Sequence, residues 1–365
     1  MTSLPKGTKT MTSLPLRRIR IAGLAVALAG AGVTFLAAPA NAAAITGSAG
    51  GGVQASLGGG GCTVTGGPFT SPLPVLPLNS NSSTPFSASA NATGTSSGNA
   101  ADVTHVSASL QGTAFSTEVG GSAQSVGVDG VLSVTADSSF GLASACSGGA
   151  LGTISGSATI TVTTPAMLDL RVKARPGGYI TISQASVSSS SGVSQDIAQF
   201  SGNDGRRLTL VQPGTYNFSF TLQSQLAGPS PIPTPKTRTM PFTFRADFRT
   251  PGTAEGASGG SGTKYLTLPD AINCSTGTAT ADFTAKAGKK VKKGKKGHKA
   301  KKPVIKQADF FVGDTKVASV KNPNRDTLTT LTGIAGTEET TVEAILKLSN
   351  DKGTVSVRRT YLPCR

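Results

Sequence analysis

The chain has 365 residues, a formal net charge of +16 and a pI near 9.9, but only 14% of its residues are charged and it contains no tryptophan. After residue 42 no segment has the eighteen or so unbroken apolar residues that a bilayer-spanning helix needs. This excludes a helical membrane protein once the N-terminal segment has been removed.

The first 42 residues predict a secretory signal peptide. Three arginines near residue 20 precede an apolar run at 21–38, and small residues follow at 39–43. A basic region, a short apolar region and an Ala-x-Ala site are the three parts of such a signal. We predict cleavage after Ala42, with Ala40 as the alternative. The mature chain is therefore expected outside the cytoplasm, secreted or associated with the cell surface.

The excess of positive charge is confined to two segments. Residues 1–42 carry five cations and no acid, so removing them reduces the net charge from +16 to +11. Ten lysines between residues 286 and 302 account for most of the rest, since removing them leaves +1. The basic pI is thus a local feature. The pentapeptide MTSLP occurs twice near the N-terminus, so Met11 is an alternative to Met1 as the first residue.

Four cysteines predict two disulfides. An even number in an exported chain indicates disulfide pairing, and four cysteines allow three pairings. Proximity in sequence and the domain division described below favour Cys62–Cys146 and Cys274–Cys364. Each bond would close a loop of about ninety residues and contribute about 4–5 kcal/mol in the chain-entropy model. No CxxC pair occurs and the chain has two histidines, so we expect no zinc, no other metal and no cofactor.

Residues 43–250 predict an antiparallel β-sandwich region rich in serine, glycine and threonine. Alternating apolar residues recur in short runs separated by glycine and serine, which is typical of strands. This composition leaves 43–60 and 66–100 poorly specified, and part of them is expected to be loose. The region is either one domain or two subdomains that divide near residue 165.

From residue 168 onward the strand pattern becomes clearer. Two hairpins are predicted: LDLRVKA and YITIS around Arg-Pro-Gly-Gly (168–183), and RRLTLV and TYNFSFTL around Gln-Pro-Gly (206–222). A proline-rich loop (228–235) and a further strand (240–248) follow. No segment shows a sustained helical period, so the predicted fold class is all-β.

Residues 251–263, rich in glycine and serine, predict a flexible linker to a last domain at 264–365. Seven short strands separated by turns suggest an immunoglobulin-like sandwich. In the absence of tryptophan, Phe310 or Phe311 is expected to be its central aromatic. The predicted strands are 264–268, 276–285, 304–312, 315–320, 327–332, 341–348 and 353–361.

Three motifs in this last domain carry a family resemblance. LTLPDAINC (266–274), DFFVGDTKVASV (309–320) and RRTYLPC (358–364) resemble bacterial Ig-like domains of secreted proteins from high-GC Gram-positive bacteria. The chain departs from that pattern by having Gly313-Asp314 in place of Asn-Gly at the hairpin, and by an inserted lysine-rich loop. The resemblance covers about a hundred residues. It implies a sandwich fold and a surface or adhesive setting, but it does not imply a particular activity.

Signals for catalysis are weak, and we predict that the chain is not an enzyme. A G-x-S-x-G match at 256–260 lies in the predicted linker and lacks the strand and helix that a nucleophile elbow needs. His105, with Asp102 nearby, lies in a strand pattern, where a lone histidine is usually exposed or hydrogen-bonded. Asp196 and Asp204 lack the ligand-rich loop of a calcium site. Four tyrosines and no tryptophan offer little for stacking on sugars.

A lysine-rich segment at 286–303 is the strongest functional signal. Gly288, Gly294 and Gly297 interrupt it and Pro303 ends it, so it predicts a loop between two strands and no amphipathic helix. It is either a loop that promotes solubility or a site that binds polyanions. No aromatic residue is interleaved, so specific recognition of nucleic acid is not expected. Its candidate binding residues are Lys286, Lys289, Lys290, Lys292, Lys293, Lys295, Lys296, Lys299, Lys301 and Lys302.

Three functions follow, in order of preference. The first is an exported, non-enzymatic surface or adhesion-type protein whose lysine-rich loop contacts anionic polymers of the cell envelope. The second is a carbohydrate- or protein-binding module that uses loops of 43–250. The third is a secreted hydrolase with an unrecognised site.

Overall fold

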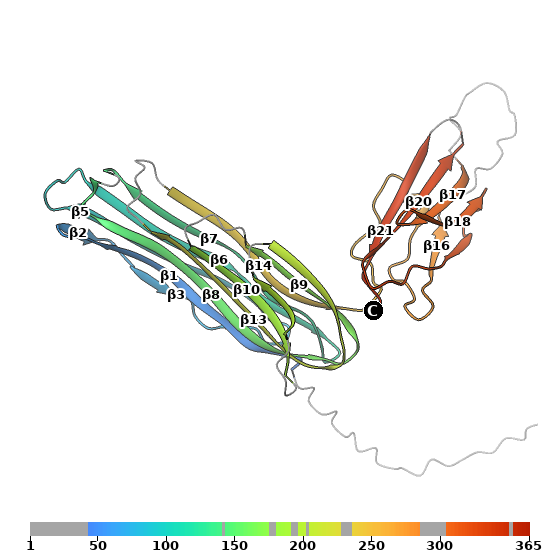
Figure 1. The fold of residues 1–365 in the computed structure, drawn as a ribbon, viewed down its shortest axis with the longest axis horizontal. Coiled ribbons are helices and arrows are strands. Elements are labelled where there is room, and N and C mark those ends of the chain that lie inside the picture. The colour runs from blue at the N-terminus through green and yellow to red at the C-terminus, as the bar shows by residue number, and fades with distance from the viewer. Residues whose placement is uncertain are drawn as a thin grey trace, which may run out of the picture. The chain divides into compact units, whose positions relative to one another are not determined.

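The computed structural model describes the chain as two β-sandwiches (Figure 1). It describes residues 43–140, 143–174, 180–190, 196–201, 204–227, 236–284, 304–349 and 353–365. The predicted signal peptide and the ten lysines at 286–302 lie outside these ranges. The described residues form strands and no α-helix, so the predicted all-β fold class is confirmed.

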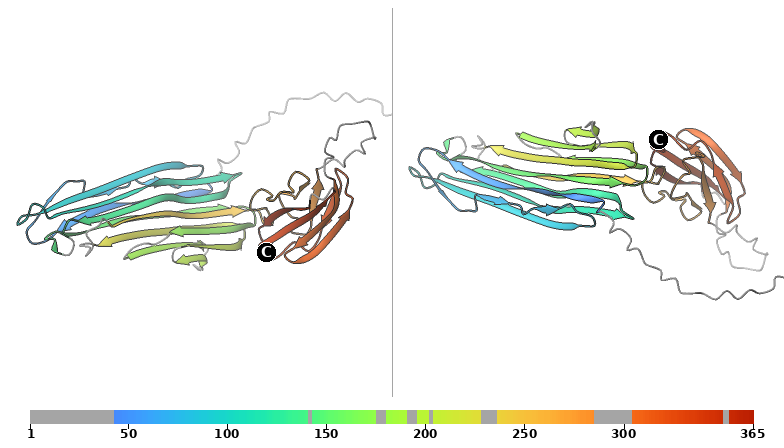
Figure 2. Two further views of the ribbon diagram at one scale, coloured as in Figure 1. Left: turned by 90° about the horizontal axis from the view of Figure 1, so that it is seen from above. Right: turned by 90° about the horizontal axis from the view of Figure 1, so that it is seen from below.

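The first sandwich spans residues 45–249. Its described strands are β1 (Ile45–Gly58), β2 (Cys62–Thr65), β3 (Thr70–Pro72), β4 (Leu76–Pro77), β5 (Ser83–Ser96), β6 (Val103–Val119), β7 (Ser122–Ser138), β8 (Ser147–Val162), β9 (Ala166–Ala174), β10 (Ile180–Ser189), β11 (Asp196–Ser201), β12 (Asp204–Val211), β13 (Gly214–Ala227) and β14 (Lys236–Arg249). Sheet I has the order β11-β10-β13-β8-β1-β3, with β4 also paired to β1, and sheet II the order β12-β9-β14-β7-β6-β5-β2. Every pairing between neighbouring strands is antiparallel. Figure 1 shows the two layers edge-on, and Figure 2 shows them turned by 90°, with the strands of the two layers overlapping.

Strands from both sides of residue 165 are neighbours in each sheet of this sandwich. In sheet I, β8 pairs with β13 along its whole length, from Val162 opposite Gly214 to Gly149 opposite Ala227. In sheet II, β7 pairs with β14 in the same way. Residues 43–250 therefore form a single sandwich.

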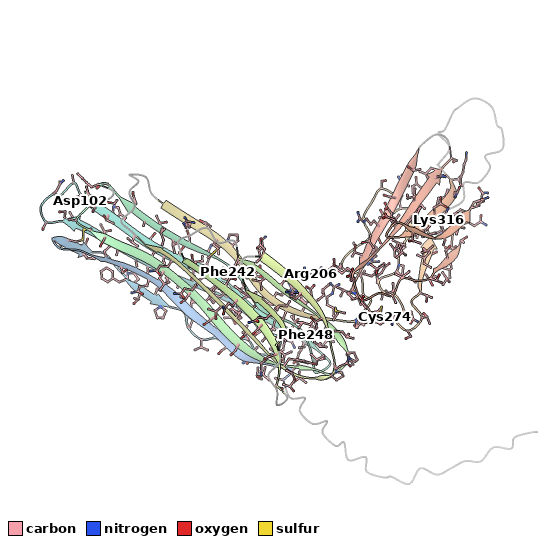
Figure 3. The ribbon with its side chains drawn as sticks, viewed as in Figure 1. Asp102, Arg206, Phe242, Phe248, Cys274 and Lys316 are labelled. Carbon is pink, nitrogen blue, oxygen red and sulfur yellow. A yellow bond between two sulfur atoms is a disulfide. The ribbon has the colours of Figure 1, made fainter. Side chains whose placement is uncertain are left out.

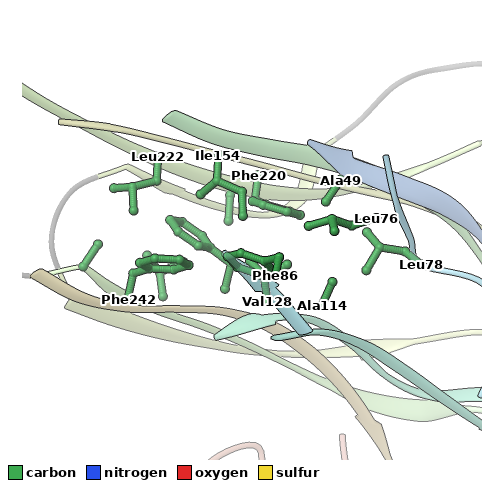
Figure 4. Packing of buried hydrophobic residues seen from close by; sticks show 14 of the residues in the cluster. Ala49, Leu76, Leu78, Phe86, Ala114, Val128, Ile154, Phe220, Leu222 and Phe242 are labelled. Atoms are coloured by element: carbon green, nitrogen blue, oxygen red, sulfur yellow. The ribbon is translucent and has the colours of Figure 1, made fainter. Parts of the chain in front are cut away.

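The core of the first sandwich lies between its two sheets. Along β5 the burial alternates, with Phe86, Ala88, Ala90 and Ala92 buried and the residues between them facing outward. Figure 4 shows side chains of the two sheets facing each other in this layer. The largest contacts are aromatic, and burying one phenylalanine contributes about 2–3 kcal/mol. Across the layer, the rings of Phe220 and Phe244 stack with centroids 5.4 Å apart.

Both predicted hairpins of the first sandwich are wrong. Strands β9 and β10 belong to different sheets, since β9 pairs with β14 and β12 while β10 pairs with β13 and β11. Likewise, β12 lies in sheet II and β13 in sheet I. At 212–214 the chain passes from one layer to the other, whereas residues 175–179, which contain the other predicted turn, lie outside the described ranges. Turn chemistry alone does not distinguish a hairpin from a connection between layers.

The second sandwich contains the seven strands that the sequence predicts. They are β15 (Leu266–Thr267), β16 (Ala279–Phe283), β17 (Ile305–Val312), β18 (Thr315–Lys321), β19 (Leu328–Leu331), β20 (Thr340–Leu348) and β21 (Thr354–Tyr361). Sheet III has the order β15-β16-β19, and sheet IV the order β18-β17-β20-β21. Of the two expected core aromatics, Phe310 is fully buried and meets Phe283 edge-on at 6.2 Å, whereas Phe311 is half-buried.

The β17–β18 hairpin explains the departure at Gly313-Asp314. Because Val312 pairs with Thr315, the turn has two residues, and Gly313 adopts a φ of 56°. A two-residue hairpin turn with glycine in the first position is a standard solution for this geometry. The hairpin therefore does not need the Asn-Gly pair.

Residues 251–263 are bound to the second sandwich and do not form the predicted flexible linker. Gly259 exchanges backbone hydrogen bonds with Arg358, at 2.8 and 2.9 Å, and the Gly262 N–H donates to the Ser356 carbonyl at 2.9 Å. Ala254 packs against the core. Glycine here allows close approach, since a Cβ at position 260 would lie 2.3 Å from the Ser356 carbonyl oxygen. The glycine-rich composition of 251–263, which suggests flexibility, therefore allows this segment to pack its backbone closely against the second sandwich.

Both disulfides have the pairing that the sequence favours. Cys62 bonds Cys146 and joins the edge strand β2 of sheet II to the start of β8 in sheet I. Cys274 bonds Cys364 and ties the β15–β16 connection to the residues after β21. Each lies against a glycine: a Cβ at Gly94 would be 2.8 Å from the Cys62 sulfur, and one at Gly252 would be 2.6 Å from the Cys274 sulfur.

Candidate functional site

The lysine-rich segment connects β16 with β17, and these strands belong to different sheets of the second sandwich. Its predicted binding residues all lie outside the described part of the chain. What the structure does define is the folded base of the segment, which consists of its two attachment points, Thr284 and Val304.

Thr284 is fixed to the neighbouring strand of sheet III. Its N–H donates to the Tyr265 carbonyl at 3.0 Å, and its Oγ1 donates to the Lys264 carbonyl at 3.3 Å. The preceding residue, Phe283, is fully buried and accepts a hydrogen bond from the Asp326 N–H at 2.8 Å. The chain therefore leaves this sheet from an ordered, hydrogen-bonded position.

Val304 is fixed in the same manner to sheet IV. Its N–H donates to Ser349 Oγ at 2.9 Å, and its carbonyl accepts from the Ser349 N–H at 2.7 Å. Beside it, the Lys306 carbonyl accepts from the Asn322 N–H at 2.8 Å. The β18–β19 connection donates hydrogen bonds beside both attachment points, from Asn322 to Lys306 and from Asp326 to Phe283. The two attachment points therefore lie at the same end of the second sandwich.

A polar cluster around Asp309 lies on the outer face of sheet IV. Lys316 Nζ is 2.6 Å from Asp309 Oδ1, Ser319 Oγ donates to the same oxygen at 2.7 Å, and Gln307 Nε2 donates at 2.9 Å (Figure 3). Lys316 first, and then Ser319, hold the pKa of Asp309 well below its usual range. An ionised, fully bonded carboxylate of this kind is a structural group and a poor general acid.

A second ionic cluster lies on the outer face of sheet II in the first sandwich. Asp169 is completely buried there, although its chain neighbours Leu168 and Leu170 point into the core on the other face. Arg206 donates to both carboxylate oxygens, at 2.8 and 2.7 Å, and Arg171 Nε donates at 3.0 Å (Figure 3 labels Arg206). Burial raises the pKa of Asp169, but the hydrogen bonds from Arg206 and Arg171 outweigh burial and lower it.

Asp102 and His105 do not form a catalytic pair. The Asp102 carboxylate accepts from Ser144 Oγ at 2.6 Å and from the Ala145 N–H at 2.8 Å, so it orders the residues before the first disulfide. His105 is exposed on β6, and its Nδ1 lies 3.1 Å from Thr93 Oγ1.

The remaining signals for catalysis lack their structural context. The G-x-S-x-G match at 256–260 runs along the second sandwich, between its backbone contacts to β21. Asp196 and Asp204 begin strands of different sheets. In the described ranges, no three His, Cys, Asp or Glu side chains come together in a way that could hold a metal ion.

The described residues offer few features for binding sugars. Tyr216, Tyr265 and Tyr361 are buried, so they present no open face for stacking. A wide, shallow depression of about 600 Å³ lies on sheet II, lined among others by Pro85, Gln111 and Val131. No charged side chain lines it.

No protein-family model and no curated protein sequence matches this chain. Among solved structures, the adhesin domain of Epf from Streptococcus pyogenes matches 66% of this chain and 80% of that chain, at 7% sequence identity and a TM-score of 0.18. A TM-score this low carries no argument about function. In the part of the chain that is described, no helix has the length and apolar character needed to cross a membrane.

Proposed function

We propose that this protein is an exported, non-enzymatic surface protein whose lysine-rich segment contacts anionic polymers of the cell envelope. The observation that carries the proposal is the placement of ten lysines in seventeen residues between β16 and β17. The segment is attached at both ends to a sandwich whose own ends are joined by Cys274–Cys364. Disulfides of this kind are typical of exported proteins, and the signal sequence agrees with export.

The chemistry of lysine sets the kind of contact. Each ammonium group near an anionic surface contributes about 1 kcal/mol, so several together give useful binding that weakens with salt. Lysine acts as a point charge without the planar fork of arginine, and its selectivity among polyanions is therefore low. The resemblance to Ig-like domains of secreted bacterial proteins supports a scaffold that displays this segment at a cell surface.

The test is retention of the mature chain on purified cell walls. Replacing the ten lysines with serine is expected to weaken retention at low salt by about 100-fold or more, because several contacts of about 1 kcal/mol are lost. Replacing them with arginine keeps the charge and is expected to keep retention. High salt, or walls stripped of their anionic polymers, should release the wild type. Unchanged retention of the serine variant would contradict the proposal.

A further inference from the structure

Four exposed lysines of the folded second sandwich surround the two attachment points of the lysine-rich segment. We call Lys264, Lys306, Lys321 and Lys347 the basal lysines. They come from four parts of the chain: Lys264 precedes β15, Lys306 lies at the start of β17, Lys321 ends β18 and Lys347 lies near the end of β20. The basic segment at 286–302 does not include them, and the charge count of the sequence alone does not single them out.

Two basal lysines lie in one row on the outer face of sheet IV. Gln307 pairs with Lys321 on one side and with Lys347 on the other. Directly paired residues of antiparallel strands project from the same face of a sheet. Neighbouring strands are about 4.8 Å apart, so the two lysines stand about 10 Å from each other across Gln307.

Lys306 lies next to this row, and Lys264 lies at the other attachment point. The register of β17 against β20 shifts between Ile305 and Gln307, which leaves Lys306 as the extra residue of a bulge. The Lys264 carbonyl accepts the hydrogen bond from Thr284 Oγ1, and its Nζ stands 5.0 Å from the centroid of the Tyr265 ring. The backbones of Lys264 and Lys306 therefore take part in the hydrogen bonds that fix the base of the lysine-rich segment.

The second sandwich is electrostatically polarised along its strands. In the described part of the end that carries the basal lysines, the acids are Asp282 and Asp326, and Asp326 is paired with Arg325 at 3.4 Å. The described part of the opposite end carries five acids and three arginines, and one of these acids, Asp270, is paired with Arg359 at 2.6 Å. The acids are Asp270, Asp314, Glu338, Glu339 and Glu343, and the arginines are Arg358, Arg359 and Arg365. The excess of positive charge on the described part of this sandwich is therefore concentrated at the end with the basal lysines, and a polyanion is attracted there.

We propose that the basal lysines form an anion site on the second sandwich, which binds a linear phosphate-bearing polymer. The inference rests on the proposed function and adds the folded half of the contact. Lysine is an effective phosphate ligand as a point charge. Lys306, Lys321 and Lys347 belong to sheet IV and Lys264 precedes the first strand of sheet III, so a flexible chain that bends around this end can reach all four.

The test uses the mature chain, with long-chain polyphosphate as the probe. The basal variant carries Lys264→Ser, Lys306→Ser, Lys321→Ser and Lys347→Ser. The control variant also removes four positive charges, through serine at the exposed residues Lys173, Arg207, Arg358 and Arg365, none of which adjoins an attachment point in the chain. A third variant replaces the ten lysines of the segment with serine.

We expect the basal variant to bind polyphosphate at least about tenfold more weakly than the wild type at low salt. The slope of log affinity against log salt should fall by about 3, since each lost phosphate contact releases about 0.7 fewer counterions on a flexible single chain. In about 0.1 M salt, where dissolved ions screen exposed charges over about 10 Å, the control variant should stay within about twofold of the wild type.

Equal affinity and salt slope in the basal and control variants would overturn the inference. If the segment variant alone loses binding, the proposed function stands without the basal site. If the segment variant binds like the wild type while the basal variant does not, the proposed function is wrong and the basal site stands.

A comparison of ligands tests the class of polymer. Tighter binding to phosphatidylglycerol vesicles than to polyphosphate would overturn the linear polymer as ligand. The double variant Lys321→Gln/Lys347→Gln repeats the test with minimal effect on folding.

Discussion

At the scale of single residues, Asp169 is the buried charge on which the outer face of sheet II depends. Its carboxylate is completely buried and accepts hydrogen bonds from Arg206 and Arg171. Because hydrogen bonds to charged groups contribute about 1.5–3 kcal/mol, Asp169→Asn should reduce the free energy of unfolding at pH 7 by about 2–3 kcal/mol. Urea unfolding measures this loss, and Asp137→Asn on the same sheet is the control.

The same cluster predicts how the stability changes with pH. The pKa of Asp169 is lowered in the folded protein, so its ionised form stabilises the fold above the unfolded pKa of about 3.9. That contribution is lost as the pH falls below 4 and passes through the lowered folded pKa. The stability difference between wild type and Asp169→Asn should therefore shrink between pH 5 and pH 2. A difference that stays constant over this range would show that the variant acts through packing and not through charge.

At this scale, the sequence predicts residues whose role follows from their neighbours in the chain or from the number of residues of one type. The cysteine pairing follows from order and domain division, and the absence of tryptophan narrows the central aromatic to Phe310 or Phe311, of which Phe310 is the buried one. The pair Asp169–Arg206 is missed because its partners are separated by 37 residues and lie on different strands. The basal lysines are missed for the same reason, since the pairing of β17 with β18 and β20 brings Lys306, Lys321 and Lys347 together.

At the scale of elements, strand positions are easier to predict than strand partners. In the second sandwich each of the seven predicted strands is present, because alternation and turn residues are local signals. In the first sandwich, turns expected to close hairpins instead connect the two sheets. The stretches 43–60 and 66–100, part of which is expected from composition to be loose, contain β1, β3, β4 and the whole of β5. Their glycines and alanines suit close packing between sheets, which composition alone does not reveal.

The element that joins β16 to β17 also predicts how the chain responds to protease. Trypsin cleaves after lysine, and the lysine-rich segment lies between Cys274 and Cys364. A brief digestion should therefore give two fragments that migrate as one band on a non-reducing gel and separate after reduction. The Cys274→Ala/Cys364→Ala variant is the control and should separate without a reductant. Separation of the wild type on the non-reducing gel would show that this disulfide does not form.

At the scale of the whole molecule, most of the excess positive charge lies outside the two folded sandwiches. Without residues 1–42 the net charge is +11, and without the ten lysines it is +1, so two near-neutral sandwiches display one strongly basic segment. The basal lysines change this picture in one respect, because they make the folded end of the second sandwich part of the basic surface. Binding of polyanions should accordingly persist, at reduced affinity, when the segment alone is removed.

This distribution of charge predicts the result of deleting residues 286–302 and closing the gap with four or five glycine and serine residues. Thr284 and Val304 lie on facing sheets, which pack about 10 Å apart, so such a bridge is long enough. Shortening a loop by about twelve residues changes its closure free energy by less than about 1 kcal/mol, in the stabilising direction. The melting temperature of the deletion variant should stay within a few degrees of the wild type, while isoelectric focusing shows a shift from strongly basic to near neutral. Loss of cooperative melting would show instead that the lysine-rich segment is needed for the fold.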